Sequence, residues 1–132
     1  MPGLYVDTSA LGRVLLGEPD AEVIRETLAR YDPWWSSALL LVELRRLARR
    51  EGIEERGEEL LSLVSTQRLD SSVLKRAAKL DPVEVRTLDA IHLDTAIQLR
   101  TRGAVDAVLT YDQQLQDGCA HHGLPVEAPV TA

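Results

Sequence analysis

Short β-prone runs alternate with longer amphipathic segments along this chain, and this alternation limits the possible folds more than any other feature. Extended segments are predicted at 4–6, 34–36, 68–69, 107–110 and 124–126. Helices are predicted at about 8–16, 23–31, 39–50, 58–64, 71–80, 88–102 and 113–121. Strands that alternate with helices form a parallel sheet with both faces covered. We therefore expect an α/β fold, a three-layer α/β/α sandwich with a central parallel sheet of about five strands, as a single domain over 1–132.

The location of the protein is predicted from features that the sequence lacks. No basic and apolar leader precedes Asp7, so no export signal is expected. The longest uncharged apolar stretch, 36–42, is far shorter than the roughly 20 residues that cross a bilayer, so no membrane partner is expected. The single cysteine, Cys119, cannot form an internal disulfide and is expected to be buried or unreactive. We therefore predict a cytoplasmic protein.

The net charge of −6 argues at first against a polyanionic partner, because nucleic acids are bound mainly through cationic contacts to phosphate. The distribution of charge matters more than its sum, since local fields steer a ligand and bound divalent ions reverse the sign of a carboxylate cluster. Much of the positive charge is concentrated in one predicted helix, at Arg45, Arg46, Arg49 and Arg50. These arginines either contact a phosphate backbone or form a solvated face paired with Glu51, Glu54 or Glu55.

Four acidic residues stand out by their positions in the predicted elements. Asp7 ends the first strand, Glu43 lies inside an apolar helix, Asp89 opens a long helix, and Asp112 follows the last core strand. Two of them have a simple structural interpretation as well, because Asp7 can cap the following helix and Asp89 can interact with a helix dipole. In a parallel sheet the carboxyl ends of the strands lie at one edge, where ligands bind. Asp7 and Asp112 are both expected at that edge.

Glu43 is explained poorly by a purely structural role. Its neighbours are mostly leucine and valine, and a buried carboxylate persists only when it is hydrogen-bonded, paired or bound to a metal. One alternative is an ion pair with Arg46 or Arg50, one and two helical turns further along. The other is a role in a cluster of carboxylates that binds a cation. Oxygen ligands without a Cys/His pattern favour Mg²⁺ or Mn²⁺ over zinc.

Two other residues of the long helix are close in sequence to Asp89. His92 lies one turn further along, and either faces the acidic cluster or packs between helices. Asp94 lies five residues from Asp89, off the same helical face, and is expected to be a solvated residue outside the cluster.

The segments around the four acids resemble the successive motifs of PIN-domain ribonucleases, in particular the VapC-type toxins of VapBC toxin–antitoxin systems. The resembling segments are Val6-Asp7-Thr8-Ser9-Ala10-Leu11, Val42-Glu43-Leu44, Leu88-Asp89-Ala90-Ile91-His92 and Leu109-Thr110-Tyr111-Asp112. Their order and spacing match the family, and the closing Gly123-Leu124-Pro125-Val126 is similar to the end of such toxins. The resemblance therefore covers nearly the whole chain.

This resemblance implies a Mg²⁺- or Mn²⁺-dependent endoribonuclease in which the four acids converge in one pocket. The ion activates a water that hydrolyses an RNA phosphodiester bond, leaving a 3′-hydroxyl and a 5′-phosphate. Arg46 and Arg50 are candidates for contacts to the RNA. Thr8 and Thr110 are candidates for binding substrate or orienting a ligand, although each could instead make only a local hydrogen bond.

The same resemblance implies particular partners and leaves alternatives. A VapB-type antitoxin would cover the site and bring the toxin to operator DNA, and the toxin would form homodimers and toxin–antitoxin hetero-oligomers. One alternative is a PIN-fold module without catalysis that binds RNA or protein. Another is a phosphatase that uses Asp7 as nucleophile, but Ser9 stands where such enzymes usually have a second aspartate.

Overall fold

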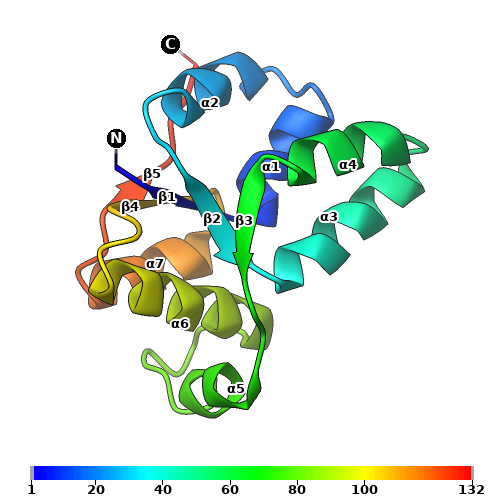
Figure 1. The fold of residues 1–132 in the computed structure, drawn as a ribbon. Helices are drawn as coiled ribbons and strands as arrows, with labels where there is room; N and C mark the ends of the chain where they lie inside the picture. The colour runs from blue at the N-terminus through cyan, green and yellow to red at the C-terminus, as the bar shows by residue number, and fades with distance from the viewer. Residues whose placement is uncertain (1, 132) are drawn as a thin grey trace.

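A computed structural model of the protein describes residues 2–131, and these form one sheet with helices on both faces. The sheet has five strands in the order β3-β2-β1-β4-β5, and every neighbouring pair is parallel. The strands are β1 (Leu4–Val6), β2 (Trp34–Ser37), β3 (Val64–Gln67), β4 (Ala107–Leu109) and β5 (Val126–Glu127). The predicted α/β/α sandwich with a parallel sheet of about five strands is confirmed (Figure 1).

Two sets of helices cover the two faces of the sheet. The helices on the first face are α1 (Thr8–Leu15), α2 (Ala21–Leu28), α3 (Leu39–Arg50) and α4 (Glu54–Leu61). The second face is covered by α6 (Thr87–Thr101) and α7 (Gln113–His121), and α5 (Ser71–Ala77) packs on α6. Successive strand residues point to opposite faces, so Leu4 and Val6 join the first core while Tyr5 joins the second.

Most elements form where the sequence predicts them, and the largest difference lies between Glu54 and Gln67. The helix expected at 58–64 runs from Glu54 to Leu61, and the strand expected at 68–69 is β3 at Val64–Gln67. Two glutamates in the first turn favour the earlier helix start, because negative charge is stabilised at a helix N-terminus. Pairing with β2, in the register Trp34↔Val64, places the strand earlier as well.

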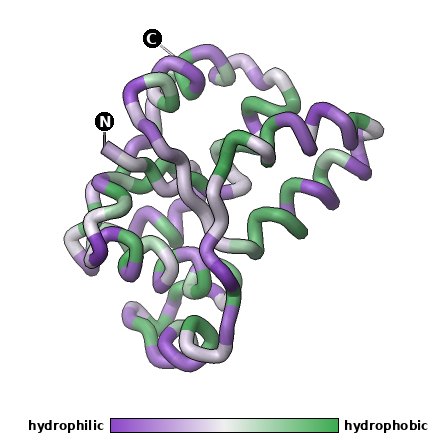
Figure 2. The backbone as a smooth tube through the Cα atoms, viewed as in Figure 1, coloured by the Kyte–Doolittle hydropathy of each residue, from purple (hydrophilic) through white to green (hydrophobic). Residues whose placement is uncertain are grey.

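Helix α6 is the most enclosed helix of the fold, and this overturns the prediction for Asp94. Residues 90–96 are all buried, because α5 covers the side of α6 that faces away from the sheet. Asp94 is therefore only 2% exposed, and the Arg76 guanidinium of α5 binds its carboxylate at 3.1 Å. The expectation of a solvated residue was wrong, although Asp94 does lie outside the candidate cluster. Along the other helices, hydrophilic and hydrophobic residues alternate as expected for elements that bury one side (Figure 2).

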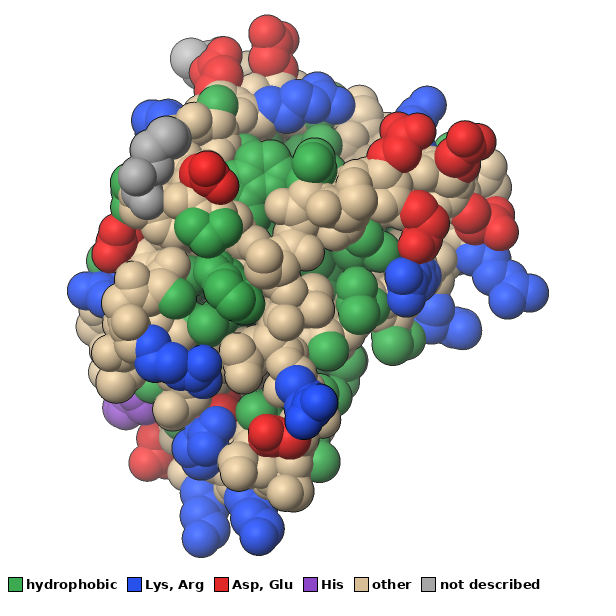
Figure 3. Space-filling view, viewed as in Figure 1, with side chains coloured by type: hydrophobic (Ala, Val, Ile, Leu, Met, Phe, Trp, Pro, Cys, Tyr) green, Lys and Arg blue, Asp and Glu red, His purple; other side chains and the backbone are tan. Residues whose placement is uncertain are grey.

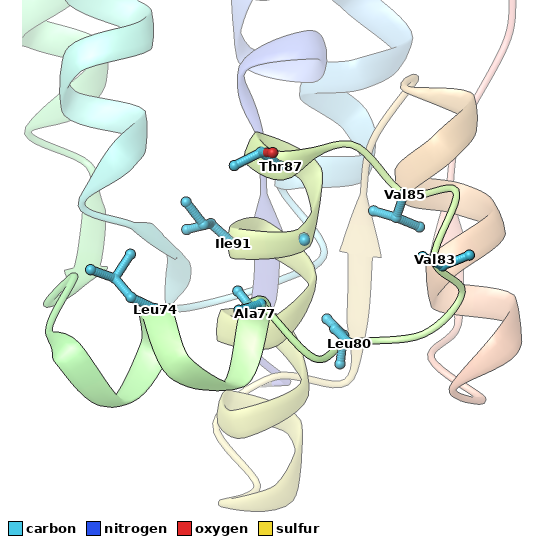
Figure 4. Close-up of a pocket in the computed structure, with 9 residues that line it drawn as sticks. Leu74, Ala77, Leu80, Val83, Val85, Thr87 and Ile91 are labelled. Atoms are coloured by element: carbon cyan, nitrogen blue, oxygen red, sulfur yellow. The ribbon is translucent and has the colours of Figure 1, made fainter.

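An open apolar groove of about 250 Å³ follows the contact between α5 and α6. Leu74 of α5, Val83 of the connecting loop and Ile91 of α6 line it, and Thr87 lies at the end nearest the start of α6 (Figure 4). Elsewhere, Cys119 is fully buried, as predicted, and burial raises the pKa of its thiol to about 12. Among residues 2–131, no helix has the length and apolar character needed to cross a membrane.

Candidate active site

The sheet places two of the four predicted acids at the carboxyl ends of adjacent strands. β1 and β4 are neighbours in the sheet, with Val6 opposite Leu109, so the residues that follow both strands meet at one edge. Asp7 comes directly after β1, and Asp112 comes three residues after β4. Glu43 of α3 and Asp89 of α6 approach this edge from the two helical layers.

Asp7 lies under the site and is almost completely enclosed by hydrogen-bond donors. Its side chain is 4% exposed, and Oδ1 accepts from Ser9 Oγ at 2.7 Å and from the Ala10 N–H at 3.1 Å. Oδ2 accepts from Thr110 Oγ1 at 2.6 Å. Burial raises the pKa of Asp7, while these hydrogen bonds and the nearby His92 oppose that rise. Asp7 therefore caps α1, as one interpretation of the sequence proposed, and it is also fixed at the sheet edge.

Thr110 links the two strand-end aspartates. Its Oγ1 donates to Asp7 and accepts from the Asp112 N–H at 3.1 Å, and the residue is fully buried. The sequence allowed Thr110 either to orient a ligand or to make only a local hydrogen bond. Its bond to Asp7, in a different part of the chain, supports the orientation of a carboxylate. Direct contact with a substrate does not fit its complete burial.

Glu43 is half-buried, and it is held by two residues that are not arginines. Its Oε1 accepts from Thr8 Oγ1 at 2.8 Å and lies 2.8 Å from His92 Nε2. Burial tends to raise the pKa of Glu43, but the bond and charge of His92 and the bond from Thr8 leave it below the ordinary value. The alternative of an ion pair with Arg46 or Arg50 is absent within residues 2–131. Within the same part of the chain Oε2 makes no hydrogen bond.

His92 faces the acidic cluster, and its other ring nitrogen bonds a buried tyrosine. The Tyr5 hydroxyl lies 2.6 Å from His92 Nδ1 and accepts from the Ser37 N–H at 3.1 Å. The Tyr5 hydroxyl therefore holds the imidazole ring from one side, while Nε2 on the other side faces Glu43. The spacing from Asp89 was the only signal for His92 in the sequence. Tyr5 had no signal, because its place in the chain is that of an ordinary core residue.

Asp89 and Asp112 lie close together, and Arg86, a residue with no distinguishing signal in the sequence, lies beside both. Arg86 Nη2 lies 3.4 Å from Asp112 Oδ2, and its Nε lies 3.7 Å from Asp89 Oδ2. Burial, followed by the negative charge of Asp112, raises the pKa of Asp89 to about 6 even though Arg86 opposes this. Asp112 also caps α7 by accepting from the Leu115 N–H at 3.0 Å.

Three of the four predicted acids line one open cavity of about 480 Å³. Its lining residues are Glu43, Arg86, Thr87, Leu88, Asp89 and Asp112. Asp7 does not line it, but lies beneath, joined to Asp112 through Thr110. In the described residues, no three acidic, histidine or cysteine side chains are already close enough to enclose a metal ion. The donors nevertheless fit a hard divalent cation, because all are carboxylate oxygens and because such an ion would relieve the repulsion between Asp89 and Asp112.

Basic side chains lie beside this cavity on the continuation of α3. Arg46, Arg49 and Arg50 line an open hollow of about 510 Å³, and among residues 2–131 no ion pair involves them. The alternative that this face pairs with Glu51, Glu54 or Glu55 is not observed within residues 2–131, and Arg45 instead forms two hydrogen bonds with Glu58 of α4. Basic side chains gather along α3, and the surface is indented between α3 and the part formed by α5 and α6 (Figure 3).

A comparison with protein-family models matches residues 4–119 to the PIN domain. The chain belongs to the PIN-domain family. Three relatives from Mycobacterium tuberculosis place it in the VapC group. Ribonuclease VapC46 is 36% identical over 98% of this chain and 99% of its own. Ribonuclease VapC47 is 34% identical and ribonuclease VapC35 is 30% identical, each over 96% of both chains.

Two solved structures share the fold of the chain. A chain from a toxin–antitoxin complex of Klebsiella pneumoniae superposes with a TM-score of 0.74 at 22% identity, covering 98% of this chain and 99% of that one. Mycobacterium tuberculosis VapC20, described as a toxin that cleaves the sarcin–ricin loop, has a TM-score of 0.68 at 17% identity. It covers 86% of this PIN domain and 93% of its own chain.

The raised pKa of Asp89 predicts how stability depends on pH. Because this pKa rises from 3.8 to about 6 on folding, the folded protein takes up a proton more readily than the unfolded chain in that range. The ionised side chain is therefore destabilising above pH 6. Asp89→Asn should raise the melting temperature by a few degrees at pH 7.5 in the presence of a chelator, and the gain should disappear as the pH falls toward 4.

Glu43→Gln is the matched contrast for this experiment, because the pKa of Glu43 is lowered. Its ionised form stabilises the fold, so the substitution should lower the melting temperature at pH 7.5, and this loss should vanish as the pH falls below 4.5. Thermal unfolding followed by circular dichroism measures both series. A stabilising effect of Asp89→Asn that is equal at every pH would contradict the assignment.

Proposed function

We propose that this PIN domain is a metal-dependent endoribonuclease and the toxin component of a type II toxin–antitoxin system. The observation that supports the proposal most is the convergence of Glu43, Asp89 and Asp112 on one cavity, above a buried Asp7 whose carboxylate accepts three hydrogen bonds. The ribonuclease names of VapC relatives at 30% to 36% identity support RNA as substrate. The four acids and their hydrogen-bond donors are present together, which favours catalysis over a binding module that has lost activity.

In this proposal Mg²⁺ or Mn²⁺ is held by Asp7, Glu43, Asp89 and Asp112. When bound, the ion lowers the pKa of a water for attack on phosphorus and stabilises the departing oxygen. The chain's part is to present carboxylate oxygens in fixed positions. A carboxylate has about four acceptor positions, and Ser9, Ala10 and Thr110 occupy three of those of Asp7. The fourth acceptor position, on Oδ2, is therefore available for the proposed ion.

Glu43 is presented in a similar way. Thr8 and His92 both bind Oε1, so the carboxylate is held by one oxygen while Oε2 stays available for a ligand. Tyr5 fixes the orientation of His92 from the other side. Thr8, His92 and Tyr5 are therefore positioning residues in this proposal. Partners that orient a ligating carboxylate commonly contribute to both metal affinity and activity.

The basic hollow on α3 is the proposed path of the RNA backbone. Arg46 and Arg50 lie three and seven residues after Glu43, so all three side chains share one side of the helix. Guanidinium groups without ion-pair partners are suited to bidentate contacts with phosphate. This local concentration of positive charge answers the objection raised by the net charge of −6.

The partners follow from the toxin assignment. An antitoxin partner is supported by the similarity to a chain from a toxin–antitoxin complex, and a VapB-type antitoxin that covers the site is a prediction from the family resemblance. A homodimer, contact with operator DNA only through the antitoxin, and a cytoplasmic location remain predictions from the family resemblance. Which RNA is cleaved depends on surfaces outside the acidic cluster.

The nuclease proposal predicts metal-dependent cleavage of RNA that requires the four acids. Purified protein should cleave structured RNA with Mg²⁺ or Mn²⁺ and not with a chelator, leaving 5′-phosphate ends. Asp7→Ala and Asp89→Ala should each lower the cleavage rate by about two orders of magnitude or more, since each removes a proposed metal ligand. Asp106→Ala, at an exposed acid outside the cavity, is the control and should cleave like the parent. Cleavage that survives Asp7→Ala and Asp89→Ala would reject the site.

The positioning role of His92 predicts a change in metal requirement. His92→Ala should raise the Mn²⁺ concentration needed for half-maximal cleavage, or lower the rate, by about tenfold to a hundredfold. His92→Gln, which keeps a side-chain donor, should recover part of the loss. His122→Ala is the control, because within residues 2–131 the exposed His122 side chain hydrogen-bonds only to the Asp81 carbonyl. An unchanged Mn²⁺ dependence in His92→Ala would contradict the role.

The toxin assignment predicts a growth phenotype. Expression of the parent chain in a bacterial host should arrest growth, and Asp89→Ala should relieve the arrest. Co-expression of a small protein encoded by the adjacent gene should relieve the arrest as well. That small protein should co-purify with the toxin. Harmless expression of a protein that cleaves RNA in vitro would indicate a housekeeping nuclease instead.

A further inference from the structure

Arg86 lies beside two of the carboxylates that would hold the proposed metal ion, those of Asp89 and Asp112. Its guanidinium lies 3.4 Å from Asp112 Oδ2 and 3.7 Å from Asp89 Oδ2. It is the only basic side chain among the residues that line the acidic cavity, as far as residues 2–131 are concerned. Both separations are longer than the roughly 2.8 Å of a tight charge-assisted hydrogen bond, so Arg86 balances the two charges without a strong bond to either.

The backbone of Arg86 is fixed while its side chain is not. The residue is the N-cap of α6, and its N–H donates to Gln114 Oε1 at 2.9 Å. Its side chain is 69% exposed, and the other residues that line the cavity are Glu43, Thr87, Leu88, Asp89 and Asp112. The guanidinium can therefore turn about an anchored Cα without any change in the fold.

We propose that Arg86 is a replaceable counter-ion that binds Asp89 and Asp112 until a divalent cation takes its place, and then binds a phosphate of the RNA. The second half of this inference rests on the proposed nuclease function, whereas the first half does not. Arg86 offers one positive charge to two carboxylates, at 3.4 Å from Asp112 and 3.7 Å from Asp89, so it balances only one of their two negative charges. A divalent cation in direct contact would neutralise both.

The displaced guanidinium would remain at the rim of the same cavity. Its forked donors match the geometry of a phosphate, and the carboxylates that held it would be occupied by the cation. The cation would then attract the phosphate from one side and Arg86 from the other. Positive charge would therefore be present in the cavity both before and after the ion binds. Arg86 would oppose metal binding and assist RNA binding.

These opposite effects give two measurements with opposite signs. Isothermal titration calorimetry with Mn²⁺ and no RNA should show that Arg86→Ala binds the ion about threefold to tenfold more tightly than the parent, because the competitor is gone. Arg46→Ala removes a nearby positive charge that forms no ion pair among residues 2–131, and should change the Mn²⁺ affinity little. Equal tightening in both variants would show a general field effect and overturn the proposal, as would unchanged affinity in Arg86→Ala.

The second measurement is RNA cleavage at saturating Mn²⁺. Arg86→Ala should raise KM for RNA by about tenfold with a smaller change in kcat, and Arg86→Lys should fall between it and the parent, because lysine keeps the charge without the fork. Arg102→Ala, at the exposed far end of α6, should match the parent. A KM that is unchanged in Arg86→Ala would refute the phosphate contact.

Failure of this inference and failure of the nuclease proposal are distinguishable. If the parent binds Mn²⁺ but cleaves no RNA, the proposed function fails while the calorimetric comparison still decides whether Arg86 competes with the cation. If the parent cleaves RNA and Arg86→Ala changes neither Mn²⁺ affinity nor KM, the nuclease stands and the role of Arg86 is rejected. Melting temperatures of all variants establish that each protein is folded.

Discussion

Repulsion between carboxylates at one edge of the sheet is the constraint on which the rest of the site depends. Asp7 and Asp112 follow adjacent parallel strands, and burial together with the nearby charge of Asp112 raises the pKa of Asp89 to about 6. Such an arrangement opposes folding unless each charge is offset. The local structure is therefore organised around donors and cations, and this explains why so many of the nearby polar side chains bond to an acid.

The offsets differ in kind from one acid to the next. Asp7 is surrounded by a backbone N–H and two hydroxyls, while Glu43 has a threonine and a histidine oriented by a buried tyrosine. These bonds come from rigid, buried elements and hold the carboxylates in place. Asp89 and Asp112 share an exposed arginine, which is the least fixed of the partners. The cavity therefore has a rigid side and an adjustable side, which is the arrangement expected where an ion and a substrate enter.

The charge of the whole chain is a poor guide to what this PIN domain binds. The sum is −6, yet three arginines without recorded partners in the described chain face outward beside the acidic cavity. Negative charge in the cavity and positive charge on α3 would separate the tasks of holding a cation and guiding a phosphate backbone. The separation of negative and positive charge depends on where the residues lie in the fold, and the amino-acid composition does not contain that information.

The sequence by itself determined the alternation of strands and helices, the parallel sheet, and the four acids, because strand ends, helix starts and apolar periodicity are local properties of the chain. It could not determine where β3 begins, since that register is set by pairing with β2. It also could not determine that Asp94 is buried against Arg76, because only the packing of α5 covers that side of α6. Tyr5, His92 and Arg86 belong to the site through contacts with residues of other elements, or, for Arg86, with two acids brought together by folding. Such contacts form only when the helices pack on the sheet. Tertiary structure alone therefore decided which side chains hold the acids and that Arg86 lies beside Asp89 and Asp112.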